Sequence, residues 1–174
     1  MSAAAAVAGI WAKARLFPPD SRRHAVGLGV FVAVVLAHWA EHLAQAYELW
    51  GRGWTLKQSR GVVGLPFPWL VSSEWLHYGF ALVMLVGLTV LRHGFSGSAR
   101  RCWNIALVIQ VWHHFEHLLL LLQAHTGVYL LGAAAPTSIL QLFAPRVELH
   151  LFYNTVVTVP MAVGMLLHMR ARRR

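Results

Sequence analysis

The chain of 174 residues is 57% hydrophobic and only 12% charged, and its mean hydropathy is +0.54. A soluble domain carries about 25% charged residues, so this composition indicates a chain that needs a lipid environment. The net charge of +9 does not indicate nucleic-acid binding, because the basic residues lie at the two termini and between apolar runs rather than in one patch with aromatic residues. The length suits a single domain.

Four apolar stretches follow an N-terminal arm of residues 1–23, and each is close to the roughly 20 residues that a helix needs to cross a bilayer. In chain order they cover residues 25–47, 69–91, 102–124 and 149–169, and a basic tail of residues 170–174 follows. None shows the alternation of a barrel strand, and a backbone in lipid must satisfy its own hydrogen bonds. The sequence thus predicts an all-α fold, a polytopic membrane four-helix bundle that forms one transmembrane domain over residues 24–169.

The distribution of Lys and Arg predicts the orientation of the spans. Eleven of these 15 residues lie before the first span, between the second and third spans, or after the fourth, and four lie in the two remaining loops. Because cytoplasmic loops carry the excess of positive charge, both termini are expected in the cytoplasm. The two longer loops are then expected on the opposite side.

The first and third spans share a polar motif. His-x-x-Glu-His-Leu begins at His38 in the first span and again at His113 in the third. The second and fourth spans match less well, because Glu74 and Glu148 are one residue closer together in sequence than the two copies of the motif are. This pattern predicts two repeated helical hairpins, related by a pseudo-two-fold axis along the membrane normal.

Polar residues interrupt every predicted span, and at about 100° per residue most of them fall on one stripe of their helix. Because the spans alternate in direction, all four groups are expected at one depth, in the outer half of the bilayer. A carboxylate near the bilayer centre costs about 2.5–3.5 kcal/mol, and pairing with histidines or a cation removes most of that cost. The candidate metal ligands are His38, Glu41, His42, Glu74, His77, His113, Glu116, His117 and His150.

Neutral imidazole and carboxylate are the ligand types that iron, copper and zinc accept. Glu74 and His77 have the Glu-x-x-His spacing of soluble di-iron helix bundles, although the first and third helices offer His-x-x-Glu-His instead. Other polar residues near the cluster are expected to be hydrogen-bond partners of the ligands rather than ligands. These are Gln45, Gln110, His114, Tyr153 and Asn154. Glu148 points nearly opposite to His150 on a helix, so its membership of the site stays open.

The remaining histidines lie at the ends of the spans. They are His24, His93, His125 and His168. Their positions predict interface histidines rather than members of the cluster. The single cysteine, Cys102, leaves no Cys-x-x-Cys pair for a zinc, iron–sulfur or c-type haem site.

Three function classes follow from the cluster. The first is a membrane metalloprotein with a non-haem centre, expected to be binuclear, that performs redox or oxygen chemistry on a lipophilic substrate such as a quinol, an alkane or a lipid. The second is a haem b electron-transfer subunit, ranked lower because haem needs one axial histidine on each of two helices and this cluster holds more. The third is a proton or metal-ion translocating subunit or a purely structural one. The inner half of the bundle has almost no polar residues, so a complete path for translocation is missing. A chain with so little extramembrane sequence is also expected to associate with partner membrane subunits.

Overall fold

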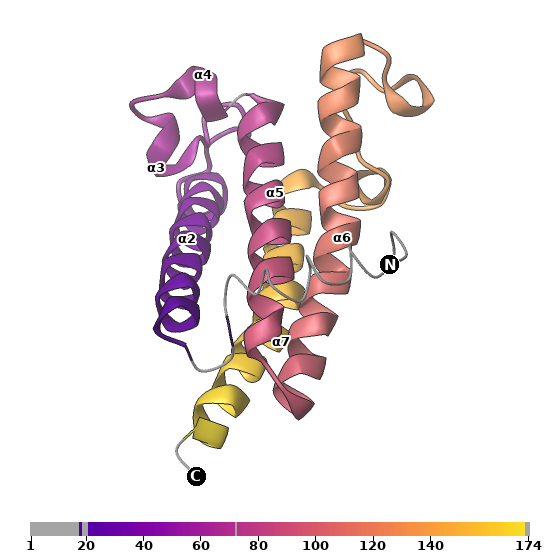
Figure 1. The fold of residues 1–174 in the computed structure, drawn as a ribbon. Coiled ribbons are helices and arrows are strands. Elements are labelled where there is room, and N and C mark those ends of the chain that lie inside the picture. Colours follow the sequence, from indigo (N-terminus) through magenta and orange to yellow (C-terminus); the bar gives the residue numbers. More distant parts are fainter. Residues whose placement is uncertain (1–17, 19–20, 72, 173–174) are drawn as a thin grey trace, which may run out of the picture.

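The structure is a computed structural model that describes residue 18, residues 21–71 and residues 73–172. In this part of the chain it consists of helices and loops, without strands. Four helices are long and apolar enough to span a membrane: Arg22–Gly51, Glu74–Gly94, Gly97–Thr126 and Arg146–Arg172. They run side by side as a bundle (Figure 1), so the predicted all-α four-helix membrane fold is confirmed. Most of the predicted N-terminal arm and the last two residues of the predicted tail lie outside the described residues.

The long helices and their short extensions are α2 (Arg22–Ala46) with the π-helical turn η1 (Tyr47–Gly51), α5 (Glu74–Leu91) with the 3-10 turn η2 (Arg92–Gly94), α6 (Gly97–Thr126) and α7 (Arg146–Arg172). Ser21 caps the start of α2, because its side chain accepts a hydrogen bond from the backbone N–H of His24 at 3.1 Å. Helix α6 ends at Gly127, whose φ of 70° is a left-handed conformation that favours glycine.

The second span begins later than the sequence predicts. The expected start at residue 69 falls in the separate short helix α4 (Pro68–Val71), and α5 begins only at Glu74. Ser73 has extended backbone angles and its side chain accepts a hydrogen bond from Trp75 N at 3.2 Å, so it ends any continuation from α4 and starts a new helix. Glu74 therefore stands in the first turn of α5.

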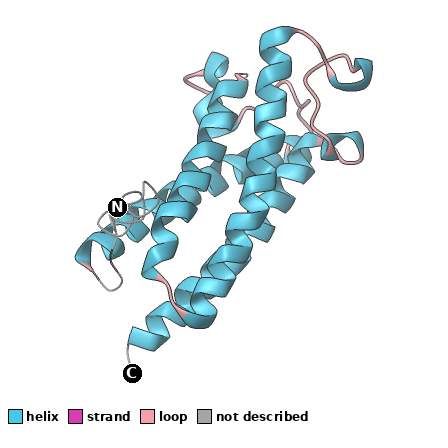
Figure 2. Cartoon of the chain, turned by 45° about the vertical axis from the view of Figure 1, so that its right-hand side comes forward, coloured by secondary structure: helices cyan, strands magenta, loops and turns pink. Residues whose placement is uncertain are grey.

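Two loops close the bundle at the end opposite the C-terminus (Figure 2). The loop between α2 and α5 contains α3 (Gly61–Gly64) and α4, and the loop between α6 and α7 contains the 3-10 turns η3 (Leu130–Gly132) and η4 (Leu140–Leu142). Both loops fold back onto the helices that they follow, through hydrogen bonds described below.

The other half of the bundle has an apolar core. Trp103 and Leu88 are fully buried in it, together with Phe31 and Met161. The Trp103 indole Nε1 donates to the backbone oxygen of Leu88 at 2.8 Å, so its one polar atom is satisfied. At the crossing of α6 and α7, a Cβ on Gly164 would stand only 3.0 Å from the Ala99 backbone oxygen. A glycine there allows the close helix approach that is typical of membrane bundles.

Helix α2 packs less closely than the others. Of the most apolar stretch of 18 residues in this helix only 17% is buried inside the bundle, whereas 44% of the corresponding stretch of α6 is buried. Val26 and Val30 are 58% and 60% exposed, so this helix presents an apolar face to its surroundings. A lipid bilayer is the environment that such a face requires.

Two of the predicted interface histidines are buried instead. His24 is 1% exposed and His168 is 7% exposed, and their ring centroids lie 5.6 Å apart. The His24 Nε2 atom lies 3.1 Å from the backbone oxygen of Leu91, at the end of α5. His24 thus satisfies a carbonyl that the helix end leaves without an intrahelical partner. His93 and His125 are exposed, as expected of interface residues.

Candidate functional site

Six histidines from all four long helices form one cluster in the half of the bundle nearer the loops. They are His38 and His42 on α2, His77 on α5, His113 and His117 on α6, and His150 on α7. Four of them, at positions 42, 113, 117 and 150, are no more than 7% exposed. The helical phase predicted from the sequence therefore brings the six imidazoles together, and the name "histidine cluster" is used for these six residues below.

The ring spacings in the cluster are short and continuous. The pairs on single helices are closest, with centroids 4.4 Å apart for His38 and His42 and 4.5 Å apart for His113 and His117. His150 lies between these pairs, 5.0 Å from His42 and 5.3 Å from His117. His77 is 5.8 Å from His150 and 6.1 Å from His117. No ring is separated from the rest.

These spacings can be compared with those of imidazoles on one metal ion. Two imidazoles bound at about 2.0–2.1 Å, with an angle of about 90–110° between them, hold their centroids about 4.5–5.2 Å apart. The contacts that link His38, His42, His150, His117 and His113 are all close to that range. In the side-chain conformations of the structure, however, no three His, Cys, Asp or Glu side chains of the described residues converge on one point as metal ligands do.

Hydrogen bonds orient two of the rings. The Nδ1 atom of His150 lies 2.7 Å from the backbone oxygen of Arg146, and that of His77 lies 3.3 Å from the backbone oxygen of Ser73. A carbonyl oxygen only accepts, so each Nδ1 carries the proton and each Nε2 is left as the acceptor. The same Nδ1–H to carbonyl bond commonly fixes the tautomer of metal-binding histidines.

Three buried nitrogen atoms of the cluster have no hydrogen-bond partner in the part of the chain that the structure describes. They are His150 Nε2, His113 Nδ1 and His117 Nδ1. Buried polar atoms in folded proteins are nearly always paired, so each unpaired one needs an explanation. These atoms belong to three neighbouring rings, whose centroids lie 4.5–6.0 Å apart.

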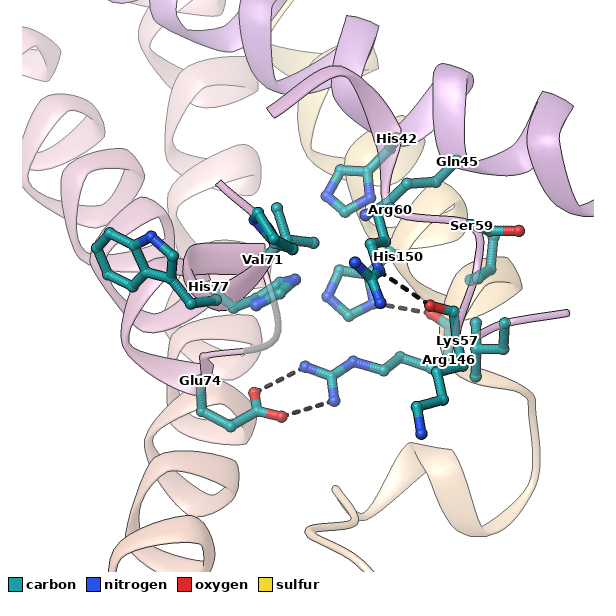
Figure 3. Close-up of a pocket in the computed structure, with 14 residues that line it drawn as sticks. His42, Gln45, Lys57, Ser59, Arg60, Val71, Glu74, His77, Arg146 and His150 are labelled. Atoms are coloured by element: carbon teal, nitrogen blue, oxygen red, sulfur yellow. Dashed lines mark hydrogen bonds and ion pairs between the residues drawn. The ribbon is translucent and has the colours of Figure 1, made fainter. Parts of the chain in front are cut away.

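The three glutamates that the sequence offers as ligands all have protein partners. Glu41 accepts a hydrogen bond from Val63 N at 3.0 Å. Glu116 accepts one from Leu140 N at 2.8 Å and another from the Tyr153 hydroxyl at 3.0 Å. Glu74 forms a bidentate ion pair with Arg146, with N–O distances of 2.6 and 2.7 Å (Figure 3). The carboxylates hold loops and helix ends in place.

Two further residues, which the sequence analysis did not select, hold the same loops. Glu48 accepts a hydrogen bond from Gly61 N at 2.8 Å. Gln123 accepts from Leu130 N at 2.8 Å and donates to the backbone oxygen of Thr137 at 2.8 Å. Glu48 and Gln123 occupy the same register relative to the His-x-x-Glu-His motif of their own helix, so extending the motif toward the C-terminus finds them.

Gly61 is required where the first loop meets α2. Its φ is +66°, and a Cβ at this position would contact the Glu41 carboxylate and would lie 3.0 Å from Gln45 Cγ. Only a residue without a side chain lets the loop backbone approach Glu41 and Glu48 so closely.

Corresponding positions of the two predicted hairpins make similar ring contacts. His38 stacks on Phe80 with centroids 4.5 Å apart and planes at 26°, and His113 packs on Tyr153 at 4.1 Å and 32°. Phe80 and Tyr153 have the same separation in sequence as His77 and His150. Glu74 and Glu148 are one residue further apart in sequence. A repeat that aligns the ring contacts therefore does not place these two glutamates at corresponding positions.

Glu148 lies in the first turn of α7. One of its carboxylate oxygens is buried without a hydrogen bond among the described residues. It is not among the residues that line the cavities beside the cluster.

The predicted hydrogen-bond partners of the ligands have different surroundings. Gln110 is buried and donates to the backbone oxygen of Ala81 at 3.1 Å rather than to a histidine. His114 lies away from the cluster, with its ring 5.1 Å from that of Tyr78. Tyr153 and Asn154 line a cavity together with the cluster, and Gln45 lines another.

Several cavities adjoin the histidine cluster, and the inner cavity and the basic cavity are two of them. The inner cavity has a volume of about 20 Å³, and the histidines that line it are His38, His77, His113 and His117. A cavity of about 10–15 Å³ holds one water molecule, so this space suits a single water or ion. The basic cavity is larger, with a volume of about 510 Å³ (Figure 3). Its wall on the cluster side is His42, His77 and His150, and its charged residues are Lys57, Arg60, Arg146 and Glu74.

No family model, no curated protein and no solved structure matches this chain. The function must therefore be argued from the chemistry of the histidine cluster and the cavities beside it.

Proposed function

We propose that the chain is an integral membrane metalloprotein whose histidine cluster binds one or two ions of iron, copper or zinc. Iron or copper at this site would supply redox or oxygen chemistry on a lipophilic substrate, whereas zinc has no redox chemistry. The observation that carries this proposal is the continuous contact of six imidazoles from four helices. Three of these imidazoles have a buried nitrogen without a partner among the described residues. Imidazole nitrogen is a preferred ligand of all three metals.

A purely structural role fits the cluster less well. Polar side chains within membrane helices normally bond to one another across helices. Here His113, His117 and His150 leave nitrogen atoms without such bonds among the described residues, although Gln110, which lies near them, is satisfied. A shared cation would satisfy several of these nitrogens at once and would offset the cost of burying them.

The proposed ligands are the six histidines, and the glutamates are proposed to position them. Glu41, Glu74 and Glu116 already have backbone N–H, hydroxyl or guanidinium partners. Since the rings do not converge on one point in the structure, binding requires them to rotate about their side-chain bonds. The inner cavity is lined by four of the rings, so it is a space toward which they can turn.

The paired geometry of the two hairpins supports the proposal that the chain contains a repeat. Each hairpin contributes a pair of histidines from its first helix and one histidine from its second. The packing of His38 on Phe80 and of His113 on Tyr153 supports the same relationship. A binuclear centre with three histidines from each hairpin is the arrangement that this symmetry favours.

The orientation in the membrane is part of the same proposal. The excess of Lys and Arg on one side of the spans supports a cytoplasmic location for both termini. The histidine cluster and the two long loops then lie toward the outer face. A quinol that diffuses within the bilayer could reach such a site, and the exposed apolar face of α2 leaves room for a partner membrane subunit.

The two alternatives have weaker support. Haem b needs one axial histidine on each of two helices, whereas six histidines from four helices meet in this cluster. Translocation would need a polar path through the bundle. Beyond the cluster lies the apolar core around Phe31, Leu88 and Trp103, which separates it from His24 and His168 at the other end.

The test is the metal content of the protein purified in detergent, measured by mass spectrometry together with a visible absorption spectrum. One or two iron, copper or zinc ions per chain without a Soret band are expected. The matched control replaces the exposed His93 and His125 with alanine, which should leave the metal content unchanged. A Soret band, or a protein that stays without transition metal after incubation with each ion, would overturn the proposal.

A further inference from the structure

We propose that the basic cavity binds an oxyanion, such as a carboxylate or phosphate group, directly beside the histidine cluster. This inference rests on the proposed metal site and names the class of ligand that completes it. The cavity is a built feature of the described structure, with a volume of about 510 Å³ and three histidines of the cluster in its wall. One of these, His150, is 6% exposed, and its Nε2 atom has no partner among the described residues.

The charges around the cavity favour an anion. Lys57, Arg60 and Arg146 line it, and Glu74 is the one acidic residue among its described lining residues. Glu74 is neutralised by its bidentate pair with Arg146, which leaves the charges of Lys57 and Arg60 without an acidic partner in the described cavity wall. An entrance with this charge attracts anions and repels free metal cations.

The helix geometry adds to the positive potential. Both α5, from Glu74, and α7, from Arg146, begin at the cavity wall. The positive ends of two helix dipoles therefore lie at the cavity, where backbone N–H groups of a first turn favour negative charge. Arg146 also links the two sites, because its backbone oxygen accepts the Nδ1–H of His150.

The metal site itself needs a negative partner. Histidines bind metals as neutral ligands, so a divalent ion held by imidazoles alone keeps its full charge in a medium of low dielectric constant. The carboxylates of Glu41, Glu74 and Glu116 are bonded to protein groups. An oxyanion that enters through the basic cavity would supply the missing negative charge where His42, His77 and His150 meet the cavity.

The loop that carries Lys57 and Arg60 is held in position. Gly61 N donates to Glu48 and Val63 N donates to Glu41, and the Arg60 Nε atom donates to the Lys57 backbone oxygen at 3.1 Å. The cavity wall also contains apolar side chains, namely Leu56, Trp69, Val71 and others. A volume in the range of about 300–1,000 Å³ suits an organic ligand, so a carboxylate with an apolar chain fits this lining.

The experiment uses the full chain in detergent, loaded with Cu(II), and azide as a spectroscopic probe whose binding to copper produces a charge-transfer band. Acetate, octanoate and inorganic phosphate are then added as competitors. Azide should bind, and its dissociation constant should rise about tenfold in the double variant Lys57→Gln/Arg60→Gln while the copper content stays the same. The charge-matched control Arg100→Gln/Arg101→Gln, on exposed residues at the start of α6, should bind azide like the wild type.

The outcomes separate the two claims. Competition by acetate and octanoate identifies a carboxylate, tighter competition by octanoate identifies use of the apolar wall, and competition by phosphate identifies a phosphate group. If copper is bound but azide affinity is equal in all three proteins, or if no oxyanion competes, the anion site is overturned and the metal site stands. If the wild-type protein binds no copper, and no iron or zinc after incubation with those ions, the metal site fails and the anion site falls with it.

Discussion

Glu74 and Arg146 form a bidentate ion pair between the first turns of α5 and α7, with Nη1–Oε1 and Nη2–Oε2 distances of 2.6 and 2.7 Å. The Arg146 side chain is 29% exposed and the Glu74 side chain 11%, so the pair is largely screened from solvent. His77 follows Glu74 by one helical turn on α5, and His150 follows Arg146 by one turn on α7, with its Nδ1 bonded to the Arg146 backbone oxygen. The pair thus joins the two hairpins at the point where their histidines meet.

Replacing Glu74 with Gln should destabilise the protein by about 2–3 kcal/mol, because Arg146 would keep its charge without a carboxylate; fully buried pairs lose about 3–5 kcal/mol. The measurement is unfolding in mixed micelles by circular dichroism. The double variant Glu74→Gln/Arg146→Gln should regain part of the loss, since it removes the unpaired charge as well. Equal stability of the single variant and the wild type would show that the pair contributes nothing.

Gly61→Ala should destabilise the loop between α2 and α5 by more than Gly53→Ala does. Both glycines have a φ of +66°, so the backbone strain of an alanine is the same. A Cβ at Gly53 meets nothing within 4 Å, whereas a Cβ at Gly61 contacts the Glu41 carboxylate. The difference should be about 1–3 kcal/mol, the usual range for overpacking. Limited proteolysis of the loop measures it, and equal cleavage rates in the two variants would contradict the tight contact.

Glu41→Gln and Glu116→Gln should each retain the metal. These side chains serve as acceptors for Val63 N and Leu140 N, and the amide oxygen of a glutamine can still accept those hydrogen bonds. Each hydrogen bond then loses only the extra strength that the charge gives it, about 1–2 kcal/mol. Metal content by mass spectrometry distinguishes the roles. Loss of metal in both variants would make the glutamates ligands.

His38→Ala and His113→Ala should each lower the metal content, and by similar amounts. The two residues occupy corresponding positions, with partners on the same helix at 4.4 and 4.5 Å and an aromatic ring packed on each. His114→Ala, on the neighbouring residue whose ring lies against Tyr78, is the matched control. If neither variant loses metal, or if only one does, the symmetric arrangement is wrong.

Much of the bundle could be predicted from the sequence, because lipid restricts the chain to apolar helices and helical phase is regular. Hydropathy predicts the four spans, and the stripe of His38, His42, His113 and His117 predicts the cluster without knowledge of the packing. The predicted start of the second span is too early, because hydropathy does not register the cap at Ser73.

The partners of the charged residues could not be predicted in the same way. Glu41 and Glu116 bond to loop backbone 22 and 24 residues later, and no side-chain pattern marks a backbone N–H as a partner. In the sequence Arg146 is only a loop charge that bears on orientation, and its pairing with Glu74 depends on how the hairpins pack. The burial of His24 and His168 likewise depends on contacts between distant helices.

X-ray absorption at the metal edge tests the central claim most directly, because it reports the ligands themselves. A metal bound by the histidine cluster should show a first shell dominated by nitrogen at about 2.0–2.1 Å, with the outer-shell scattering of several imidazole rings. That signal should weaken in His42→Ala and His117→Ala, which remove one ring from each hairpin. A first shell of oxygen without imidazole scattering would contradict the account.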